Sequence, residues 1–241
     1  MLELKDICFD VETDGKKRRL LKNVNLQVEK GLTALTGPNG GGKSTLAKII
    51  AGIYRPVSGK ILLDGNDITD LSVTERAKGG ISFAFQQPVR FKGITVMDLL
   101  SIACGQAISV SKACEYLSEV GLCAKDYLNR EVNASLSGGE LKRIEIATVM
   151  ARSTPVSLFD EPEAGIDLWS FQNLIRVFEG LHDKTDGTIL IISHQERILN
   201  IADRIVLIAD GEVAKSGTRE EILPTLLSGG GFCKTLADKA L

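Results

Sequence analysis

Residues 35–45 read L-T-G-P-N-G-G-G-K-S-T, and this stretch decides how the remainder of the chain is interpreted. Within it, Gly37, Gly42, Lys43 and Ser44 fill the pattern G-x-x-x-x-G-K-[ST] that is typical of phosphate-binding loops. Glycines allow the tight turns that bring backbone N–H groups close to phosphate oxygens. Lys43 is placed to reach the β- and γ-phosphates of a nucleotide, and the Ser44 hydroxyl to bind Mg²⁺. The stretch therefore predicts a nucleotide-binding loop.

The flanks of this loop favour the same interpretation over a glycine-rich turn without function. Residues 32–36 form a short apolar run, and residues 45–51 (T-L-A-K-I-I-A) have the pattern of an amphipathic helix. The order strand, loop, helix is required because the helix N-terminus adds its dipole to the phosphate site. The residues predicted to surround the phosphates are Gly37, Pro38, Asn39, Gly40, Gly41, Gly42, Lys43, Ser44 and Thr45.

The composition excludes several classes of protein. The chain has 241 residues, of which 44% are hydrophobic, enough for one large domain. A formal net charge of -2 gives no basic surface for nucleic acid. No apolar run approaches the ~18 residues of a membrane helix, so no direct membrane span is predicted. The N-terminus M-L-E-L-K-D does not resemble a signal peptide.

The first part of the sequence has the alternation of half-buried strands. Residues 1–11 and 21–28 alternate apolar and polar side chains, and Asp14 and Gly15 between them are a strong hairpin signal. Residues 61–63 form a further strand that Asp64 and Gly65 end. These strands predict an antiparallel patch beside a nucleotide-binding core.

The second part alternates short apolar strands with helices. Strands are expected at 81–85, 156–159, 188–192 and 204–208. A helical stretch is expected at 95–128, and helices from 140 to about 152, at 168–181 and from 195 onward. This alternation predicts a mostly parallel sheet covered on both faces. We expect one domain over 1–241, with a core at 1–94 and 129–227, a helical subdomain at 95–128 and a tail at 228–241.

Two acids follow the buried strand at 156–159. Asp160 ends that strand where an open parallel sheet has its ligand crevice, so its carboxylate is placed to hold the Mg²⁺ that Ser44 also binds. Glu161 is then placed to polarise an attacking water. An ordinary solvated turn is the alternative for these two acids taken alone.

A second candidate anion site lies at Ser137, Gly138 and Gly139. These residues precede a predicted helix, so their exposed N–H groups and the serine hydroxyl can bind an anion. Two phosphate sites exceed the needs of one nucleotide, and this one is therefore expected to close on the γ-phosphate held by another subunit. A plain helix N-cap is the alternative.

Together these motifs resemble a known family. The segments G-P-N-G-G-G-K-S-T, L-S-G-G-E and L-F-D-E, with Gln86 and His194, occur in the order found in the ATP-binding cassette (ABC) ATPases. The resemblance covers nearly the whole chain and implies an α/β fold of the P-loop NTPase type. That fold has a mostly parallel core sheet, an antiparallel β sub-sheet and a helical subdomain. The resemblance also implies ATP and Mg²⁺ as cofactors and hydrolysis of ATP to ADP and phosphate.

The resemblance assigns a role to each site residue. Glu161 becomes the catalytic base, His194 the contact to the γ-phosphate, and Gln86 the residue that senses Mg²⁺ and water. The implied metal ligands are Ser44, Gln86 and Asp160. Residues 136–140 become the signature loop, and 164–167 the contact between two cassettes in an ATP-dependent homodimer.

One position departs from the family pattern. The aromatic residue that stacks on adenine falls at about Val11, with Phe9 as a substitute. The residue that contacts adenine is therefore left open.

Several segments are more specifically similar to the SufC-type ATPases of iron–sulfur cluster assembly. They are E-R-A-K-G-G-I-S-F-A-F-Q-Q-P-V at 75–89, R-E-V-N at 130–133, S-G-G-E-L-K-R at 137–143 and H-Q-E-R-I-L at 194–199. This similarity implies a SufB/SufD-like scaffold protein as partner, bound through residues 86–96 and the helices after them. The short helical insert and Pro162 depart from it, so the nucleotide-binding subunit of an ABC membrane transporter is the alternative.

Five cysteines occur without a C-x-x-C pair. Free thiols in a chain without an export signal predict a reducing, cytoplasmic location. Cys104, Cys114 and Cys123 invite a metal site, but their spacing puts them on helices without a shared face. We expect them to be ordinary buried apolar residues.

Overall fold

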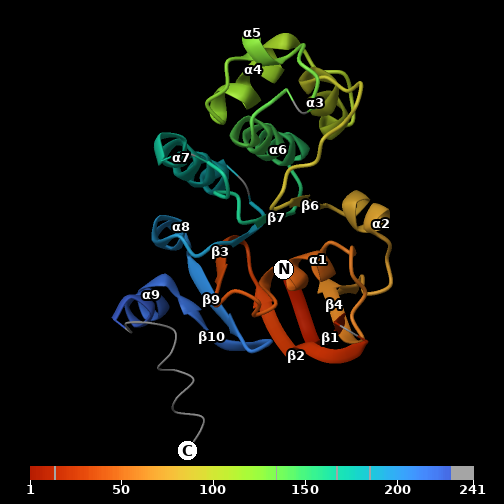
Figure 1. The fold of residues 1–241 in the computed structure, drawn as a ribbon, viewed down its shortest axis with the longest axis vertical. Helices are drawn as coiled ribbons and strands as arrows, with labels where there is room; N and C mark the ends of the chain where they lie inside the picture. The colour runs from red at the N-terminus through yellow and green to blue at the C-terminus, as the bar shows by residue number, and fades with distance from the viewer. Residues whose placement is uncertain (14, 134, 167, 185, 229–241) are drawn as a thin grey trace, which may run out of the picture. The chain divides into compact units, whose positions relative to one another are not determined.

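A computed structural model of the protein describes residues 1–228 except 14, 134, 167 and 185. Apart from Ser228, the tail predicted at 228–241 lies outside the described residues. The chain divides into two units, the first formed by Met1–Val73 with the segment from Ile192 onward, and the second by Thr74–Ile191. Figure 1 labels most of the helices and strands of both.

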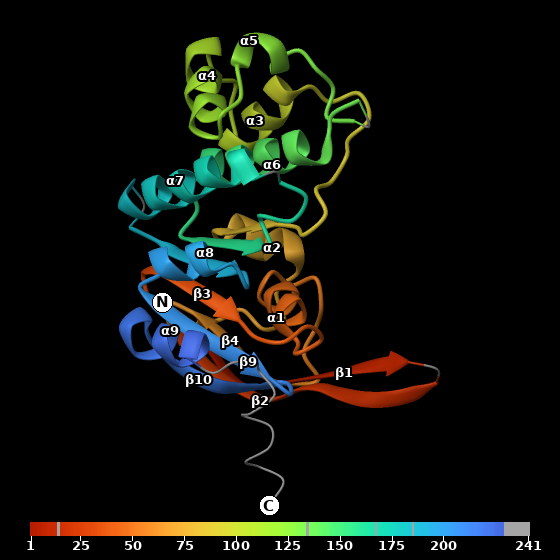
Figure 2. The ribbon, with the colours of Figure 1, turned by 60° about the vertical axis from the view of Figure 1, so that its left-hand side comes forward.

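The first unit contains the antiparallel sheet. Its strands, in spatial order, are β2 (Lys16–Val28), β1 (Leu2–Thr13), β4 (Ser58–Leu63) and β5 (Asn66–Asp67). Leu2 pairs with Val28 on one side and with Leu63 on the other. Figure 2 shows β1 and β2 side by side as a long hairpin. Because all these strand pairs are antiparallel, the predicted antiparallel sub-sheet is confirmed.

The first unit also carries three strands of the core sheet. Their spatial order is β10 (Glu212–Thr218), β9 (Arg204–Ala209) and β3 (Gly31–Thr36). β3 and β9 are parallel, with Thr33 opposite Arg204. The helices of this unit are α1 (Lys43–Ile50), α8 (Glu196–Ile201) and α9 (Arg219–Ser228). Sequence reasoning missed β10, whose side chains are mostly exposed, and α9, which contains Pro224.

The second unit carries strands β8 (Thr188–Ile192), β7 (Val156–Asp160) and β6 (Ile81–Ala84), in that spatial order. β6 and β7 are parallel, with Ile81 opposite Val156. All five residues of β7 and of β8 are buried, as expected of strands covered on both faces. The larger helices here are α6 (Gly138–Arg152) and α7 (Leu168–Lys184), and α2 (Val73–Lys78) precedes β6. The predicted parallel α/β core is therefore confirmed.

The segment predicted as helical at 95–128 contains α3 (Val96–Cys104), α4 (Val110–Glu119) and α5 (Ala124–Tyr127). Thr95 and Asp98 form a capping box at the start of α3, and Ser109 caps α4. Both helices pack against α6 within the second unit. The boundaries proposed for a separate helical subdomain stay a prediction.

Candidate nucleotide-binding and hydrolysis site

The phosphate loop joins β3 to α1 in a conformation that depends on glycine. Gly37 has φ 141° and Gly42 has φ 101°, values that side chains disfavour. A Cβ on Gly37 would lie 1.9 Å from the Ile208 carbonyl oxygen, and one on Gly42 would lie 2.4 Å from Leu21 Cδ2. The loop is therefore pressed against β9 and β2, and only hydrogen atoms fit at these two positions.

Lys43 lies inside this loop with only 6% of its surface exposed. Its ammonium donates to the Gly37 carbonyl at 2.8 Å and the Pro38 carbonyl at 2.9 Å. Gly42 caps α1, so the first N–H groups of the helix point toward the loop. A fixed cation and a helix N-terminus in a glycine-rich loop fit the phosphates of ATP. Ser44 and Thr45, in the first turn of α1, are half-buried.

His194 belongs to the same unit as the phosphate loop. The backbone N–H of Ser193 donates to the Leu35 carbonyl at 3.1 Å, two residues before the loop begins. This hydrogen bond holds the segment of His194 beside the strand that leads into the loop, and the imidazole is exposed. The placement is compatible with the predicted contact to a γ-phosphate.

In the second unit, β6 and β7 bring Gln86 and Glu161 together. Ala84 lies opposite Phe159 in the parallel register. Gln86 comes two positions after Ala84, and Glu161 comes two positions after Phe159. Gln86 Nε2 donates to Glu161 Oε2 at 2.5 Å. Glu161 has φ 44°, a value that residues other than glycine rarely adopt. This conformation changes the direction of the carboxylate at the end of the strand.

Asp160 precedes Glu161 and has only 1% of its surface exposed. A buried carboxylate at the end of a core strand is the kind of hard oxygen ligand that Mg²⁺ prefers. Ser44 belongs to the other unit, so the shared metal site of Ser44, Gln86 and Asp160 stays a prediction.

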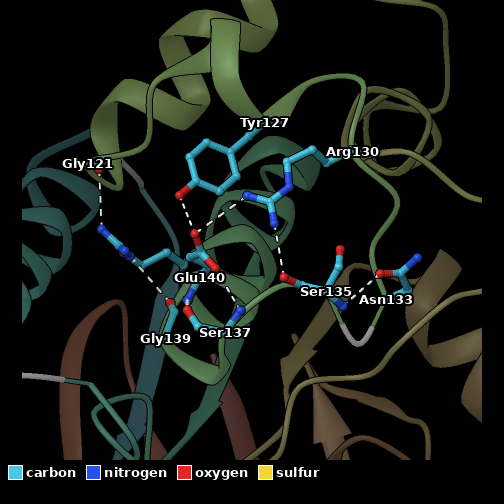
Figure 3. Close-up of polar contacts among 9 residues, drawn as sticks. Gly121, Tyr127, Arg130, Asn133, Ser135, Ser137, Gly139 and Glu140 are labelled. Carbon is cyan, nitrogen blue, oxygen red and sulfur yellow. Dashed lines mark hydrogen bonds and ion pairs between the residues drawn. The ribbon is translucent and has the colours of Figure 1, made fainter.

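The signature residues start α6 (Figure 3). Ser137 Oγ accepts from the Glu140 N–H at 3.2 Å, and Glu140 Oε2 accepts from the Ser137 N–H at 2.7 Å. The N-cap geometry considered from the sequence is thus present. Ser137 and Gly138 are exposed, which leaves this helix start accessible from outside the unit. The role of Ser137, Gly138 and Gly139 in binding a γ-phosphate stays a prediction.

Glu140 has further partners in the helical segment (Figure 3). The Tyr127 hydroxyl donates to Glu140 Oε1, and Arg130 Nη1 lies 3.7 Å from the same oxygen. The hydrogen bond from Tyr127, followed by that from the Ser137 N–H, lowers the pKa of Glu140 to about 2. Glu140 is therefore an ionised anchor that ties α6 to residues 127–130.

Sequence reasoning missed Lys142, which is fully buried on α6. Its ammonium donates to the Phe85 carbonyl, one residue before Gln86. The available signal was a Lys–Glu pair three residues apart, Lys142 and Glu145, on a predicted helix.

The structure shows the surroundings of the candidate adenine-contacting residues and of the cysteines. Phe9 stacks on Tyr54, with ring centroids 5.4 Å apart and planes 17° apart, whereas Val11 is half-exposed. Cys104 is half-buried, but Cys114 and Cys123 are exposed, so the expectation that these cysteines are buried was wrong for those two. Within the described ranges, no three His, Cys, Asp or Glu side chains are grouped so as to hold a metal ion.

Comparison with known proteins bears on these features. The profile of the ABC transporter family matches residues 21–164, more than half of the chain. The chain belongs to the ABC transporter family. An uncharacterized ABC transporter ATP-binding protein of Methanocaldococcus jannaschii is 44% identical over 222 residues, which are 88% of this chain and 88% of that protein. The probable ATP-dependent transporter ycf16 of Pyropia yezoensis is 35% identical over 235 residues, 90% of this chain and 91% of that protein.

A solved ABC structure has the same fold. It is a dimeric post-hydrolysis state of the ATP-binding cassette MJ0796 bound to ADP and Pi, with a TM-score of 0.81 and 26% identity. The match covers 91% of this chain and 99% of that one. As an ABC ATPase, the present chain hydrolyses ATP. The relatives named here are transporter proteins, which favours the alternative over the cluster-assembly interpretation.

The described part of the chain contains no helix with the length and apolar character needed to cross a bilayer.

Proposed function

We propose that this ABC ATPase is the nucleotide-binding subunit of a membrane transporter. The proposal rests on its relatives, which are named as transporter proteins. Two of them match this chain over nearly their whole lengths. A further relative, the sulfate/thiosulfate import ATP-binding protein CysA 2 of Shewanella oneidensis, is 36% identical and matches 84% of this chain and 59% of its own. ATP hydrolysis here would power a shape change in a partner that supplies the membrane span.

The proposed chemistry uses residues from both units. Lys43 and the loop N–H groups hold the phosphates, and Glu161 polarises the attacking water. Ser44, Gln86 and Asp160 would hold Mg²⁺, which would supply positive charge to offset the developing charge on the phosphate oxygens. His194 orients the γ-phosphate. The helix start at Ser137–Gly139 closes on the ATP of a second cassette, so that hydrolysis is tied to an ATP-dependent homodimer.

The partner is expected to bind the segment after Gln86. Val89 is 44% exposed, and Phe91 and Ile94 are half-buried. Hydrogen bonds from the Phe91 N–H to the Val132 carbonyl (2.7 Å) and from the Val132 N–H to the Ile94 carbonyl (2.9 Å) fix this segment. A fixed, partly apolar segment that follows a catalytic residue suits a partner that must sense hydrolysis.

Native complexes test this proposal directly. We expect the chain to be recovered from native extract in a complex that requires detergent for extraction. Val89→Asp should reduce that recovery, because it places a charge in the apolar contact. The control is Val73→Asp, at a valine of similar exposure (47%) that lies outside residues 86–96 and the helices after them, and this change should have no effect. Recovery in a detergent-independent complex with a scaffold protein would overturn the transporter proposal.

A second candidate is the energising ATPase of a SufB/SufD-like scaffold in iron–sulfur cluster assembly. It rests on the resemblance of residues 130–133 and 137–143 to segments of SufC-type ATPases, and side chains of these residues form a hydrogen-bond network (Figure 3). Arg130 Nη2 donates to the Ser135 carbonyl at 3.1 Å, and Asn133 Oδ1 accepts from the Ser135 N–H at 2.9 Å. The same fractionation decides between the two candidates.

A further inference from the structure

Lys142 is a charged side chain with no exposed surface. It lies in the second turn of α6, and its ammonium donates to the Phe85 carbonyl and, at 3.4 Å, to the Gln86 carbonyl. It also forms an ion pair with Glu145 Oε2 at 3.3 Å. A lysine that extends from one helix to two consecutive carbonyls fixes the main chain there at two points.

Glu145 reaches the same segment from the next turn of α6. Its Oε1 accepts the Phe85 N–H at 2.9 Å, and its side chain is only 14% exposed. The carboxylate of Glu145 thus binds the N–H of Phe85, and the ammonium of Lys142 binds the carbonyls of Phe85 and Gln86. Burial lowers the pKa of Lys142 and raises that of Glu145, so keeping both charges here is unfavourable except for these contacts.

Such a pair is a weak source of stability. Apolar side chains of similar volume often serve a protein interior as well as a buried ion pair does, because taking two charges out of water is costly. What an apolar pair cannot provide is a fixed position for a short main-chain segment. The segment held here ends in Gln86, whose side chain donates to Glu161 at 2.5 Å.

The N-terminal part of α6 has independent ties on its other side. Glu140 is bound by the Tyr127 hydroxyl, and Arg143 Nη1 donates to the Gly121 carbonyl at 3.3 Å. The helix begins at Ser137. One rigid element therefore connects the signature residues, the helical segment and the Gln86 main chain.

We propose that Lys142 and Glu145 are positioning residues that hold Gln86 against Glu161 and pass a displacement of α6 to the catalytic carboxylate. The inference rests on the proposed roles of Gln86 and Glu161. Ligand contact at Ser137 would then alter the Gln86–Glu161 hydrogen bond through the two charged side chains, without contact between Lys142 and the nucleotide.

The test is Lys142→Met, which removes the charge and keeps the length of the side chain. We expect kcat for ATP to fall roughly 10- to 100-fold, because small displacements of a catalytic group have effects of this size. KM for ATP should change less than about twofold, because the phosphate loop is elsewhere. The matched control is Lys112→Met, which breaks an exposed Lys–Glu pair of the same spacing on α4 (2.7 Å to Glu115) and should leave kcat unchanged.

Repeating the measurement in the Gln86→Ala background distinguishes a positioning role of Lys142 from a purely structural one. If Lys142 acts through Gln86, Lys142→Met should cause little further loss of kcat there. An equal loss of kcat in both backgrounds, or no loss in either, would overturn the proposal. Should Lys142→Met fail to fold, the Glu145→Gln variant is used in the same cycle with the same criteria.

The Glu161→Gln variant tests the proposed role of Glu161 separately from the positioning role of Lys142. If this variant hydrolyses ATP at the normal rate, the proposed role of Glu161 fails, whatever the Lys142 variants show. If Glu161→Gln is inactive and the Lys142 cycle shows no coupling to Gln86, only the positioning role fails.

Discussion

Gly37→Ala tests whether the phosphate loop depends on the close approach of Gly37 to β9. The added Cβ would meet the Ile208 carbonyl oxygen at 1.9 Å and its carbonyl carbon at 3.0 Å. Real Cβ atoms essentially never approach closer than 3.0 Å, so the loop must retreat by at least about 1.1 Å, the difference between 3.0 and 1.9 Å. The obstacle is backbone of a core strand, which cannot rotate away as a side chain can.

The expected cost has two parts. Backbone strain at φ 141° costs about 1–3 kcal/mol for a residue other than glycine. Overpacking against β9 adds about 1–3 kcal/mol. Gly40→Ala is the matched control, because Gly40 also has positive φ (76°) but nothing lies within 4 Å of its added Cβ. That variant should lose only the strain, about 1–2 kcal/mol.

Urea unfolding and calorimetric titration with ATP measure the two variants. Gly37→Ala should be less stable than Gly40→Ala by about 1–3 kcal/mol and should bind ATP more weakly, because its loop N–H groups are displaced. If the two variants match within about 0.5 kcal/mol and bind ATP equally, the inferred contact with Ile208 is wrong.

Three further predictions concern the site. Lys43→Ala should weaken ATP binding about 10- to 100-fold, since hydrogen bonds to charged groups contribute about 1.5–3 kcal/mol; unchanged affinity in a nucleotide titration would refute the loop assignment. Glu161→Gln with Mg-ATP should accumulate a dimer by light scattering, and Ser137→Arg added to it should abolish that dimer; monomer alone in Glu161→Gln would contradict the proposed closure. Tyr127→Phe should raise the pKa of Glu140 from about 2 toward its ordinary 4.5. Because a lowered pKa stabilises the fold above 4.5, the stability difference from wild type should be full at pH 6 and shrink as the pH falls from 4.5 toward 2; a pH-independent difference in urea unfolding would contradict it.

The sequence by itself determined the phosphate loop and the strand and helix on either side of it. A glycine-rich turn between an apolar strand and an amphipathic helix is a local pattern, because dihedral preferences and helix capping act over a few residues. The same holds for Ser137, whose capping box with Glu140 lies within four residues. These features can be read without knowing what packs against them.

Only the tertiary structure decided which distant residues meet. The Gln86–Glu161 hydrogen bond follows from the register of β6 on β7, and the clash at Gly37 follows from Ile208 on β9, 171 positions later in the chain. The sequence predicted no role for Lys142, which is fully buried because the helix face it occupies lies against the main chain of residues 85–86. Strand register and side-chain burial depend on long-range packing, and a pattern of nearest neighbours does not contain that information.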